Sequence, residues 1–309
     1  MMDHPDNIVI QPLIGEAIKG SQPIVALESA VITHGLPRPI NLELALELQE
    51  IIRQEGAIPA TIAVLDGSVH IGLENSELER LANLQVSRKI SRRDFGYAAA
   101  KELSGGTTVA GTLTAANIAG IKVFATGGIG GVHRGTHYDI SADLEVLGRI
   151  PMIIVCAGAK AILDIPATME VLETHGVLVA GYQTNELPAF YSRTSGIRLD
   201  SRLDTPAEIV MTAMSQWKLG IKSSLVIVQP PPIEFEIPSN EIEECIQSAI
   251  SEANKLGIQG PAVTPYLLKK IKDLTEGRSM ATNLALLKNN AKLAAQIALA
   301  LHPLTGNRI

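Results

Sequence analysis

Short runs of apolar residues alternate along the chain with longer segments in which apolar positions recur at a helical period. The runs are rich in Val, Ile and Ala, as expected for strands that are buried on both faces. They predict strands over residues 23–27, 61–65, 121–125, 152–157, 177–180 and 224–229. The amphipathic segments predict helices over residues 8–20, 41–54, 75–83, 112–119, 143–149, 166–174, 205–218, 239–255 and 264–301.

This alternation predicts a three-layer α/β/α fold with a central mixed or mostly parallel sheet. Asp66-Gly67 adds a hairpin from the second strand into residues 69–71, and Asn41 is expected to cap the helix that follows it. No linker or change in composition divides the chain. We therefore expect residues 1–309 to form one domain, with a core over about residues 20–302.

The segment 123–143 contains the densest group of functional side chains. Its strand is followed by Thr126 and by four glycines, Gly127, Gly128, Gly130 and Gly131. Glycine permits positive φ and lets backbone N–H groups approach an anion. Two basic and two acidic residues come next, His133, Arg134, Asp139 and Asp143. The mixture favours a phosphorylated substrate with a divalent ion, and a glycine-rich surface loop is the alternative.

Two more charged residues follow predicted strands. Glu28 ends the strand 23–27, at the edge where open α/β sheets place their ligands, or it caps the next turn. Lys160 follows the strand 152–157 and two small residues. It is either a surface lysine whose amine reaches water or a Schiff-base nucleophile.

Three other segments are open to a structural or a functional interpretation. The basic cluster 86–94 is a helix start capped by Ser91 or Asp94, or a source of cations for a phosphate. Residues 182–191 hold much of the aromatic content and could form the wall of a base-sized pocket. The final helical stretch contains three asparagines, Asn283, Asn289 and Asn290, which are either exposed or functional.

Composition narrows the class of protein. The 309 residues are 46% hydrophobic but only 3% aromatic, so the core must be aliphatic. A net charge of −6 without a basic tract argues against nucleic-acid binding, and no apolar stretch predicts a membrane span. Only two cysteines are present, and the first residues lack the pattern of a signal peptide, so we expect a cytoplasmic protein.

Taken together, six motifs resemble the pseudouridine-5′-phosphate glycosidase, or indigoidine synthase A-like, family. They occupy residues 27–29, 34–37, 86–94, 125–134, 139–143 and 156–160, in the order of the family. The resemblance extends over about residues 20–302. It implies reversible cleavage of the C–C glycosidic bond of pseudouridine 5′-phosphate to uracil and ribose 5-phosphate. It also implies an α/β/α fold, one Mn²⁺ per subunit and a homotrimer.

The resemblance assigns a role to individual residues. It implies that Lys160 forms an imine with the opened ribose, that Glu28 donates the proton to uracil and that Asp139 binds the metal. The residues that it implies line the substrate are Lys89, Val109 through its backbone, Ser141, Ala142 and Asp143. Contacts to phosphate or sugar are implied for Thr126, His133 and Asn283. The loop 134–139, which contains His137, is shorter than is usual in the family.

Two other classes of protein would use a similar anion-binding segment. A sugar or nucleoside kinase is one, although no Gly-x-x-x-x-Gly-Lys-Ser/Thr loop is present. A non-catalytic protein that binds phosphorylated metabolites is the other, and it would have no use for Lys160 or Glu28. Trapping of a lysine adduct with borohydride distinguishes both from the glycosidase.

Overall fold

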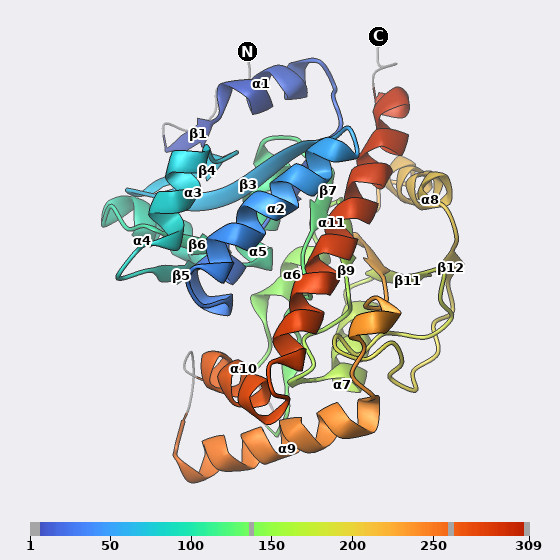
Figure 1. The fold of residues 1–309 in the computed structure, drawn as a ribbon. Coiled ribbons are helices and arrows are strands. Elements are labelled where there is room, and N and C mark those ends of the chain that lie inside the picture. Colours follow the sequence, from blue (N-terminus) through green and yellow to red (C-terminus); the bar gives the residue numbers. More distant parts are fainter. Residues whose placement is uncertain (1–6, 136–138, 259–262, 306–309) are drawn as a thin grey trace.

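The computed structural model describes residues 7–135, 139–258 and 263–305. Its centre is an eleven-stranded sheet with the path β1-β4-β3-β2-β7-β9-β13-β11-β12, and β6 and β5 branch from β3 (Figure 1). Seven strands of the path run parallel, from β3 to β12, whereas β4 and β6 pair with β3 in the antiparallel sense. The predicted mixed and mostly parallel sheet is confirmed.

The strands are short, as expected for a buried parallel sheet. The parallel set comprises β3 (Ile58–Leu65), β2 (Ile24–Leu27), β7 (Val123–Ala125), β9 (Ile153–Cys156), β13 (Leu225–Val228), β11 (Leu178–Tyr182) and β12 (Arg202–Leu203). The rest of the sheet comprises β1 (Ile8–Ile10), β4 (Ser68–Ile71), β5 (Arg88–Ile90) and β6 (Gly105–Thr107). A separate two-stranded sheet pairs β8 (Val132–His133) with β10 (Leu163–Asp164).

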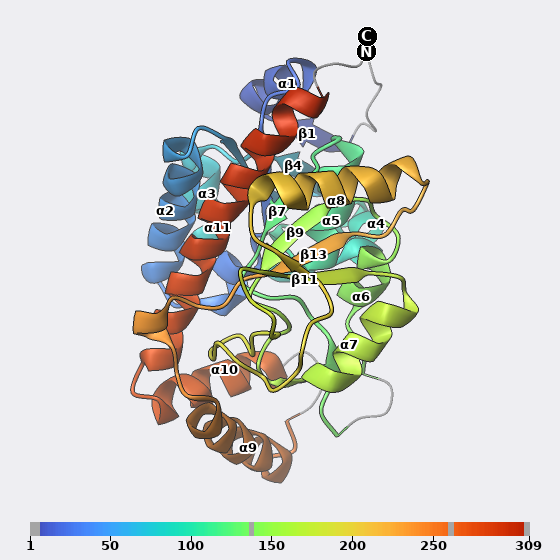
Figure 2. The same ribbon diagram turned by 90° about the vertical axis from the view of Figure 1, so that its right-hand side faces the viewer.

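Helices cover both faces of the sheet (Figures 1 and 2). One layer contains α2 (Ile40–Gln54), α8 (Pro206–Lys218) and the long α11 (Arg278–Thr305), and the other contains α5 (Val109–Ile118), α6 (Ala142–Leu147) and α7 (Ile165–Thr174). The pair α9 (Ser239–Lys255) and α10 (Val263–Leu274) lies at the carboxyl ends of the strands, at the bottom of Figure 1. The remaining helical elements are α1 (Pro12–Lys19), α3 (Asn75–Ala82), α4 (Phe95–Ala100), the π-helical turn η1 (Val31–Gly35) and the 3₁₀ turns η2 (Arg92–Asp94) and η3 (Ile233–Phe235).

Most predicted elements are present, and three predictions need correction. Residues 8–20 form a strand and a helix rather than one helix, because Pro12 starts a helix well but interrupts the ladder of a strand. Asn41 does not cap α2, which begins one residue earlier. Its buried amide donates instead to the carbonyl oxygens of Ile32 and Ala82, at 2.9 and 3.1 Å. The stretch 264–301 is two helices that a turn at Gly277, with φ of 84°, separates.

One aliphatic core joins the layers. Its buried residues extend along the chain from Ile14 to Leu301, and Phe124 on the central strand β7 is its largest fully buried side chain. A single domain stays our prediction, since the main core includes residues from both ends of the chain. The hairpin prediction is confirmed, with Asp66 and Gly67 both at positive φ between the antiparallel β3 and β4.

Asn290 connects the last helix to the central strand. Its side chain is fully buried, and its amide nitrogen donates to the backbone oxygen of Thr126, at 2.9 Å, where β7 ends. Its own side-chain oxygen has no hydrogen-bond partner among the described residues. Asn290 is therefore not the exposed asparagine that was one alternative, whereas its neighbour Asn289 is partly exposed and its side chain makes no hydrogen bond to the described residues.

We expect Asn290→Ala to lower the free energy of unfolding by about 1–3 kcal/mol, because it leaves the buried Thr126 oxygen unpaired. Asn289→Ala is the matched control on the same helix and should change stability by about 0.5 kcal/mol or less. Urea unfolding monitored by circular dichroism measures both. Equal stability of the two variants would contradict a structural role for the Asn290 hydrogen bond.

Candidate active site

A cavity of about 490 Å³ opens at the carboxyl ends of β2, β7 and β9. Six parts of the chain line it: the turn after β2, the segment around β5, the glycines after β7, the turn after β9, the segment after β11, and the C-terminal helices α10 and α11. Predicted site residues that line it are Glu28, Lys89, Lys160 and Asn283. The sheet edge that the sequence singled out is therefore an edge at which a cavity opens.

Glu28 follows β2 directly and is held from the next strand. The Thr126 hydroxyl donates a hydrogen bond to its carboxylate. Burial raises the pKa of Glu28 above the usual carboxyl value, and attraction to Lys160 and the Thr126 hydrogen bond offset only part of this effect. A carboxyl with a raised pKa remains protonated to higher pH, as a proton donor requires. In the described part of the chain no backbone N–H donates to Glu28, so the capping alternative has no support.

The residue after Glu28 fixes this strand end. Ser29 is fully buried, and its hydroxyl donates to the Ile62 oxygen of β3 at 2.5 Å. The Thr107 hydroxyl donates to the same oxygen at 2.6 Å, and the Thr107 N–H donates to the Ser29 hydroxyl at 3.0 Å. Because these polar groups are satisfied within the core, the backbone that positions Glu28 has little freedom to move.

Lys160 lies in a turn that hydrogen bonds to the glycine-rich segment. Its backbone N–H donates to the Ile129 oxygen at 3.1 Å, and the Ile129 N–H donates to the Gly158 oxygen at 3.1 Å. Gly158 has a φ of 88°, which a larger residue rarely adopts, and this bend directs the chain back toward the cavity. The turn therefore places the Lys160 side chain in the cavity with Glu28, and the two charges interact.

Lys89 brings a second amine into the cavity from β5. The residue as a whole is exposed, but desolvation of its amine and repulsion by Lys160 lower the pKa of Lys89. Glu28 and Asp143 attract it and offset part of this shift. Two neighbouring amines opposite a carboxyl group give the cavity a positive centre that suits a dianionic phosphate.

The basic cluster 86–94 is a strand and a 3₁₀ turn rather than the start of a long helix. Ser91 and Asp94 form a capping box, as one of the two interpretations expected. Arg88 pairs with Asp94 at 2.8 Å and lies over the Tyr97 ring, so it is held within the protein. Arg93 is exposed, lines the cavity and forms no hydrogen bond or ion pair with the described residues, which leaves its guanidinium available to an anion.

The glycines after β7 are needed for close packing rather than for a positive φ. None of its four glycines has a positive φ. A Cβ on Gly130 would lie 2.2 Å from the Ser141 hydroxyl, and one on Gly128 would lie 2.6 Å from the Phe190 ring. The N–H groups of Ile129, Gly130, Val132 and His133 bond to other parts of the protein, so these four do not form the expected anion cradle. Gly127 and Gly128 line the cavity.

Asp143 closes this segment against the helix layer. Its two carboxylate oxygens accept from the N–H groups of Ala110 and Gly130, each at 2.8 Å. Since both oxygens are bonded to backbone, Asp143 acts as a positional anchor in this structure and is unsuited to be a metal ligand.

Seven predicted site residues do not line the cavity in the described part of the chain. These are Val109, Thr126, His133, Asp139, Ser141, Ala142 and Asp143. Thr126 contacts Glu28, and Asp143 is close enough to influence its pKa. Val109 begins α5, and its N–H makes no hydrogen bond to described residues. Ser141 caps α6 by accepting from the Asp143 N–H at 3.2 Å. Their roles toward substrate stay predictions.

Asp139 fits a metal site only as a single ligand. Its side chain is 59% exposed, and its carboxylate lies 3.9 Å from His133 Nδ1, beyond hydrogen-bond distance. Among the described residues no three His, Cys, Asp or Glu side chains gather as a metal site would require, and His137 lies outside the described residues. An exposed carboxylate can hold a hard cation that keeps most of its waters, so Asp139 is compatible with a weak site.

The cavity also contains residues that the sequence analysis missed or named only as part of a segment. Phe190 and Tyr191 form an aromatic wall, with ring centroids 4.9 Å apart and planes at 89°, which confirms the expectation for this aromatic segment. His34 lines the cavity, but Thr33 and the Ser87 oxygen engage its two ring nitrogens. Leu268 and Leu287 come from the C-terminal helices, where an ordinary amphipathic pattern gives no sign of a site.

Sequence comparisons with known proteins identify relatives of this chain. The chain is 53% identical over 294 residues to a pseudouridine-5′-phosphate glycosidase of Solibacter usitatus, covering 94% of this chain and 98% of the relative. It is 52% identical to one of Herpetosiphon aurantiacus, covering 96% and 98%. These relatives extend over nearly the whole chain, so the similarity includes every segment of the cavity.

Two solved structures share the fold. The crystal structure of an indigoidine synthase A-like protein from Thermotoga maritima superposes with a TM-score of 0.89 at 36% identity, covering 98% of this chain and 99% of that one. The prealnumycin C-glycosynthase AlnA, in complex with ribulose 5-phosphate, gives 0.91 at 35% identity, covering 99% and 100%. The sequence profile described as "Indigoidine synthase A like protein" matches residues 13–300. This chain belongs to the indigoidine synthase A-like family.

Proposed function

We propose that this protein is a pseudouridine-5′-phosphate glycosidase, which reversibly cleaves the C–C bond between uracil and ribose 5-phosphate. Its relatives of about 50% identity have that name. The observation that carries the proposal is the meeting of Lys160, Lys89 and Glu28 in one cavity, with the pKa of Glu28 raised by burial. A kinase is not favoured, and a non-catalytic binding protein would have no need of this arrangement.

A C-glycoside has no leaving oxygen to protonate, so the bond needs another route to break. In the proposed reaction the Lys160 amine bonds to C1′ while the C1′–O4′ bond breaks and opens the ribose ring, and the proton that the amine loses passes to the ring oxygen. The nitrogen lone pair then forms the C=N bond while the C1′–C5 electron pair passes to uracil C5. Glu28 delivers the proton to C5, and water hydrolyses the imine to ribose 5-phosphate. The carboxylate that remains takes the proton back in the direction of synthesis.

The basic side chains around the cavity suit the phosphate of this substrate. Lys89 and Arg93 contribute positive charge at one side, and Asn283 presents an amide from α11. A solved relative binds ribulose 5-phosphate, which is a pentose phosphate like the proposed product. Binding energy at a remote phosphate can orient C1′ at Lys160. The aromatic wall of Phe190 and Tyr191 is suited to the base.

The proposal also includes a metal ion, an oligomeric state and a cellular location. Asp139 would hold one divalent ion, Mn²⁺, with water as the other ligands, and the ion would supply positive charge near the substrate. We propose a homotrimer in the cytoplasm, following the family resemblance. In the described residues no helix is long and apolar enough to cross a membrane.

Borohydride trapping tests the nucleophile. Incubation of the protein with ribose 5-phosphate and borohydride should add one sugar phosphate to the peptide that contains Lys160, and Lys160→Ala should abolish both the adduct and cleavage. Lys160→Arg should not restore either, since a guanidinium remains charged and forms no imine. Peptide mass spectrometry distinguishes an adduct on Lys160 from an adduct on Lys89. Lys89 is the alternative nucleophile, because its pKa is lowered. An adduct on Lys89 would refute the assignment.

Glu28→Gln should separate adduct formation from bond formation to uracil. The variant keeps a hydrogen-bonding side chain but has no acidic proton, so it should still trap ribose 5-phosphate. Synthesis of pseudouridine 5′-phosphate should fall by about 10²–10⁴-fold. Measurement of the adduct yield and the synthesis rate on the same sample decides between proton transfer and a structural role. Near-normal synthesis would contradict proton donation by Glu28.

The same variant gives a readout that is independent of activity. The pKa of Glu28 is higher in the folded protein than the unfolded value of 4.5, so ionisation of this carboxyl destabilises the fold. Below pH 4.5 the group is neutral in both states and the variant should match the wild type. As pH rises toward neutrality, the Tm of Glu28→Gln should move above that of the wild type. A difference that does not change with pH would contradict the raised pKa.

Chelation tests the metal. Protein treated with a chelator should lose activity and regain it with Mn²⁺, and Asp139→Ala should require far more Mn²⁺ for the same activity, since it loses the one protein ligand proposed. The matched control is Glu145→Ala, which removes a neighbouring carboxylate on α6 that pairs with Arg149. Full activity of metal-free protein, with metal content verified by mass spectrometry, would exclude the requirement.

A further inference from the structure

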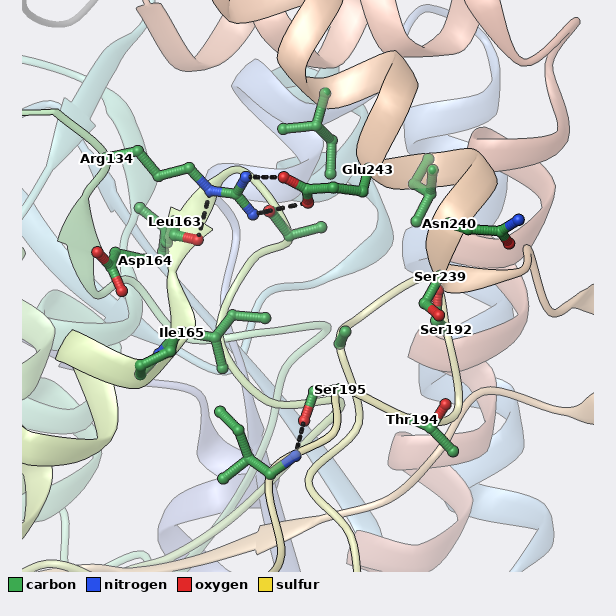
Figure 3. A pocket seen from close by; sticks show the side chains of 16 residues that line it. Arg134, Leu163, Asp164, Ile165, Ser192, Thr194, Ser195, Ser239, Asn240 and Glu243 are labelled. Atoms are coloured by element: carbon green, nitrogen blue, oxygen red, sulfur yellow. Dashed lines mark hydrogen bonds and ion pairs between the residues drawn. The ribbon is translucent and has the colours of Figure 1, made fainter.

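A second cavity, of about 670 Å³, lies next to the active-site cavity (Figure 3). The turn after β9 lies between the two. Residues 160–162 line the active-site cavity, residues 163–166 line the second, and Ala161 lines both. The segment that contains Lys160 is therefore a thin partition with open space on each side, and it needs support from elsewhere to hold a defined position.

Arg134 provides contacts at this turn. Its Nε donates to the Leu163 oxygen at 2.9 Å, and its Nη2 donates to the Ala161 oxygen at 3.1 Å (Figure 3). Its remaining contact is an ion pair with Glu243 of α9, in which Nη1 and Nη2 lie 2.5 and 3.1 Å from the two carboxylate oxygens. A planar guanidinium can make these four contacts at once, which an amine cannot.

Glu243 fixes the guanidinium from the opposite side. Burial acts to raise the pKa of Glu243, but hydrogen bonds from Arg134 and Gln247 outweigh it and lower the pKa. The carboxylate is therefore charged at neutral pH. Through it, the turn after β9 is connected to a helix that lies far along the chain, at the lower end of the molecule (Figure 1).

We propose that Arg134 and Glu243 are positioning residues for Lys160, which act by holding the carbonyl groups of Ala161 and Leu163. The inference rests on the proposed function only for its catalytic consequence. The Lys160 N–H bond to Ile129 anchors one side of the turn, and Arg134 anchors the other. With both contacts in place, the Lys160 amine is held at a defined position in the cavity.

The other role for Arg134 is contact with a substrate anion, as its place after the glycine-rich segment first suggested. The structure does not favour that role. Arg134 lines the second cavity and is absent from the active-site cavity, and each of its three side-chain nitrogens donates to a protein oxygen. Its charge is balanced by Glu243.

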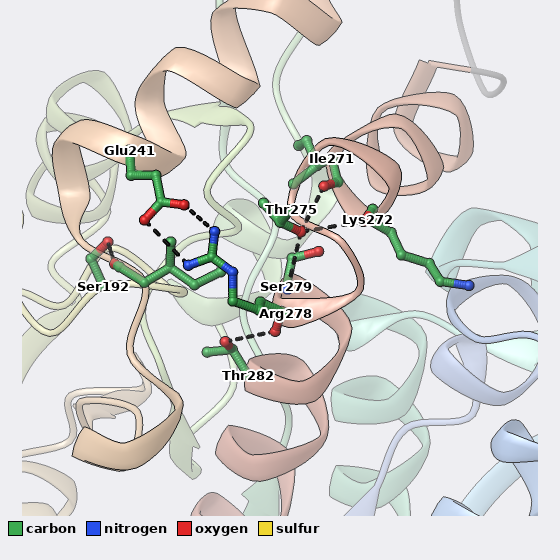
Figure 4. A network of polar contacts seen from close by, with 9 residues as sticks. Ser192, Glu241, Ile271, Lys272, Thr275, Arg278, Ser279 and Thr282 are labelled. Atoms are coloured by element: carbon green, nitrogen blue, oxygen red, sulfur yellow. Dashed lines mark hydrogen bonds and ion pairs between the residues drawn. The ribbon is translucent and has the colours of Figure 1, made fainter.

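The same helix supplies a matched control. Glu241 on α9 forms an ion pair with Arg278 at the start of α11 (Figure 4). This pair also ties α9 to the rest of the protein, but it makes no contact with the turn after β9. A general weakening of the α9 attachment would follow from loss of either pair, whereas an effect on Lys160 should follow only from loss of Arg134 or Glu243.

The experiment compares Arg134→Lys, Glu243→Ala, their combination and Glu241→Ala. Hydrogen exchange of the peptide that contains residues 157–165, read by mass spectrometry, reports the turn itself. Single-turnover trapping with ribose 5-phosphate reports Lys160. We expect at least 10-fold faster exchange and about 10–100-fold slower adduct formation in Arg134→Lys, as displacement of a reacting group by about 1 Å can cost 10²-fold. Glu243→Ala should show a smaller effect of the same kind.

In steady state kcat should fall while KM for pseudouridine 5′-phosphate stays within about 2-fold, because neither side chain lines the active-site cavity. The double variant should be no worse than Arg134→Lys, since the two residues act as one unit. Glu241→Ala should leave exchange of the turn and adduct formation unchanged.

Two results would overturn the inference. One is unchanged exchange of residues 157–165 in both Arg134→Lys and Glu243→Ala. The other is a higher KM with kcat retained, which would make Arg134 a substrate contact. Absence of an adduct in the wild-type protein would instead refute the proposed function, and the exchange experiment would still decide whether Arg134 holds the turn.

Discussion

The site depends on backbone hydrogen bonds between the segments that leave β7 and β9. The N–H of Ala157 donates to the Gly127 oxygen at 2.9 Å, and further bonds continue through Ile129 to the short pair of β8 and β10. The two segments run closely side by side, and Gly128 permits this approach, because a Cβ at that position would lie 2.9 Å from the Gly158 oxygen. Substrate-facing groups on both segments are thereby fixed relative to each other, before any ligand binds.

This constraint explains which features could be predicted from the sequence. Strand ends were predictable because buried apolar runs stop abruptly, and Glu28 and Lys160 occupy those ends and meet in the cavity. The four glycines are evident in the sequence, but the predicted reason for them, an anion cradle, was wrong. Their need for close packing could not be predicted, because packing partners such as Ser141 and Phe190 come from distant segments. For the same reason the partners of Asp143 and the burial of Asn290 could not be predicted: a helical period says which face is apolar, not which carbonyl lies opposite it.

Electrostatics ties function to a cost in stability. Desolvation raises the pKa of Glu28 above the usual carboxyl value, and two amines lie close enough to offset part of that shift. Without the amines, burial would raise the pKa further, and without burial the amines would act to lower it. Because the two effects oppose each other, the pKa of Glu28 is raised by less than burial alone would raise it. In the proposed reaction Lys160 thus has two roles, as the nucleophile and as a charge that lowers the pKa of Glu28.

The C-terminal helices complete the site from a distance in sequence. The Asn290 amide donates to the backbone oxygen of Thr126 at the end of β7, and the Thr126 hydroxyl donates to Glu28. A chain of two hydrogen bonds therefore connects α11 to Glu28, the proposed proton donor. About two turns earlier on that helix, Asn283 lines the cavity. Since α10 contributes Leu268 to the same cavity, correct docking of the last two helices is a condition for the geometry of Glu28, although neither helix contains a residue to which the proposed reaction assigns a chemical step.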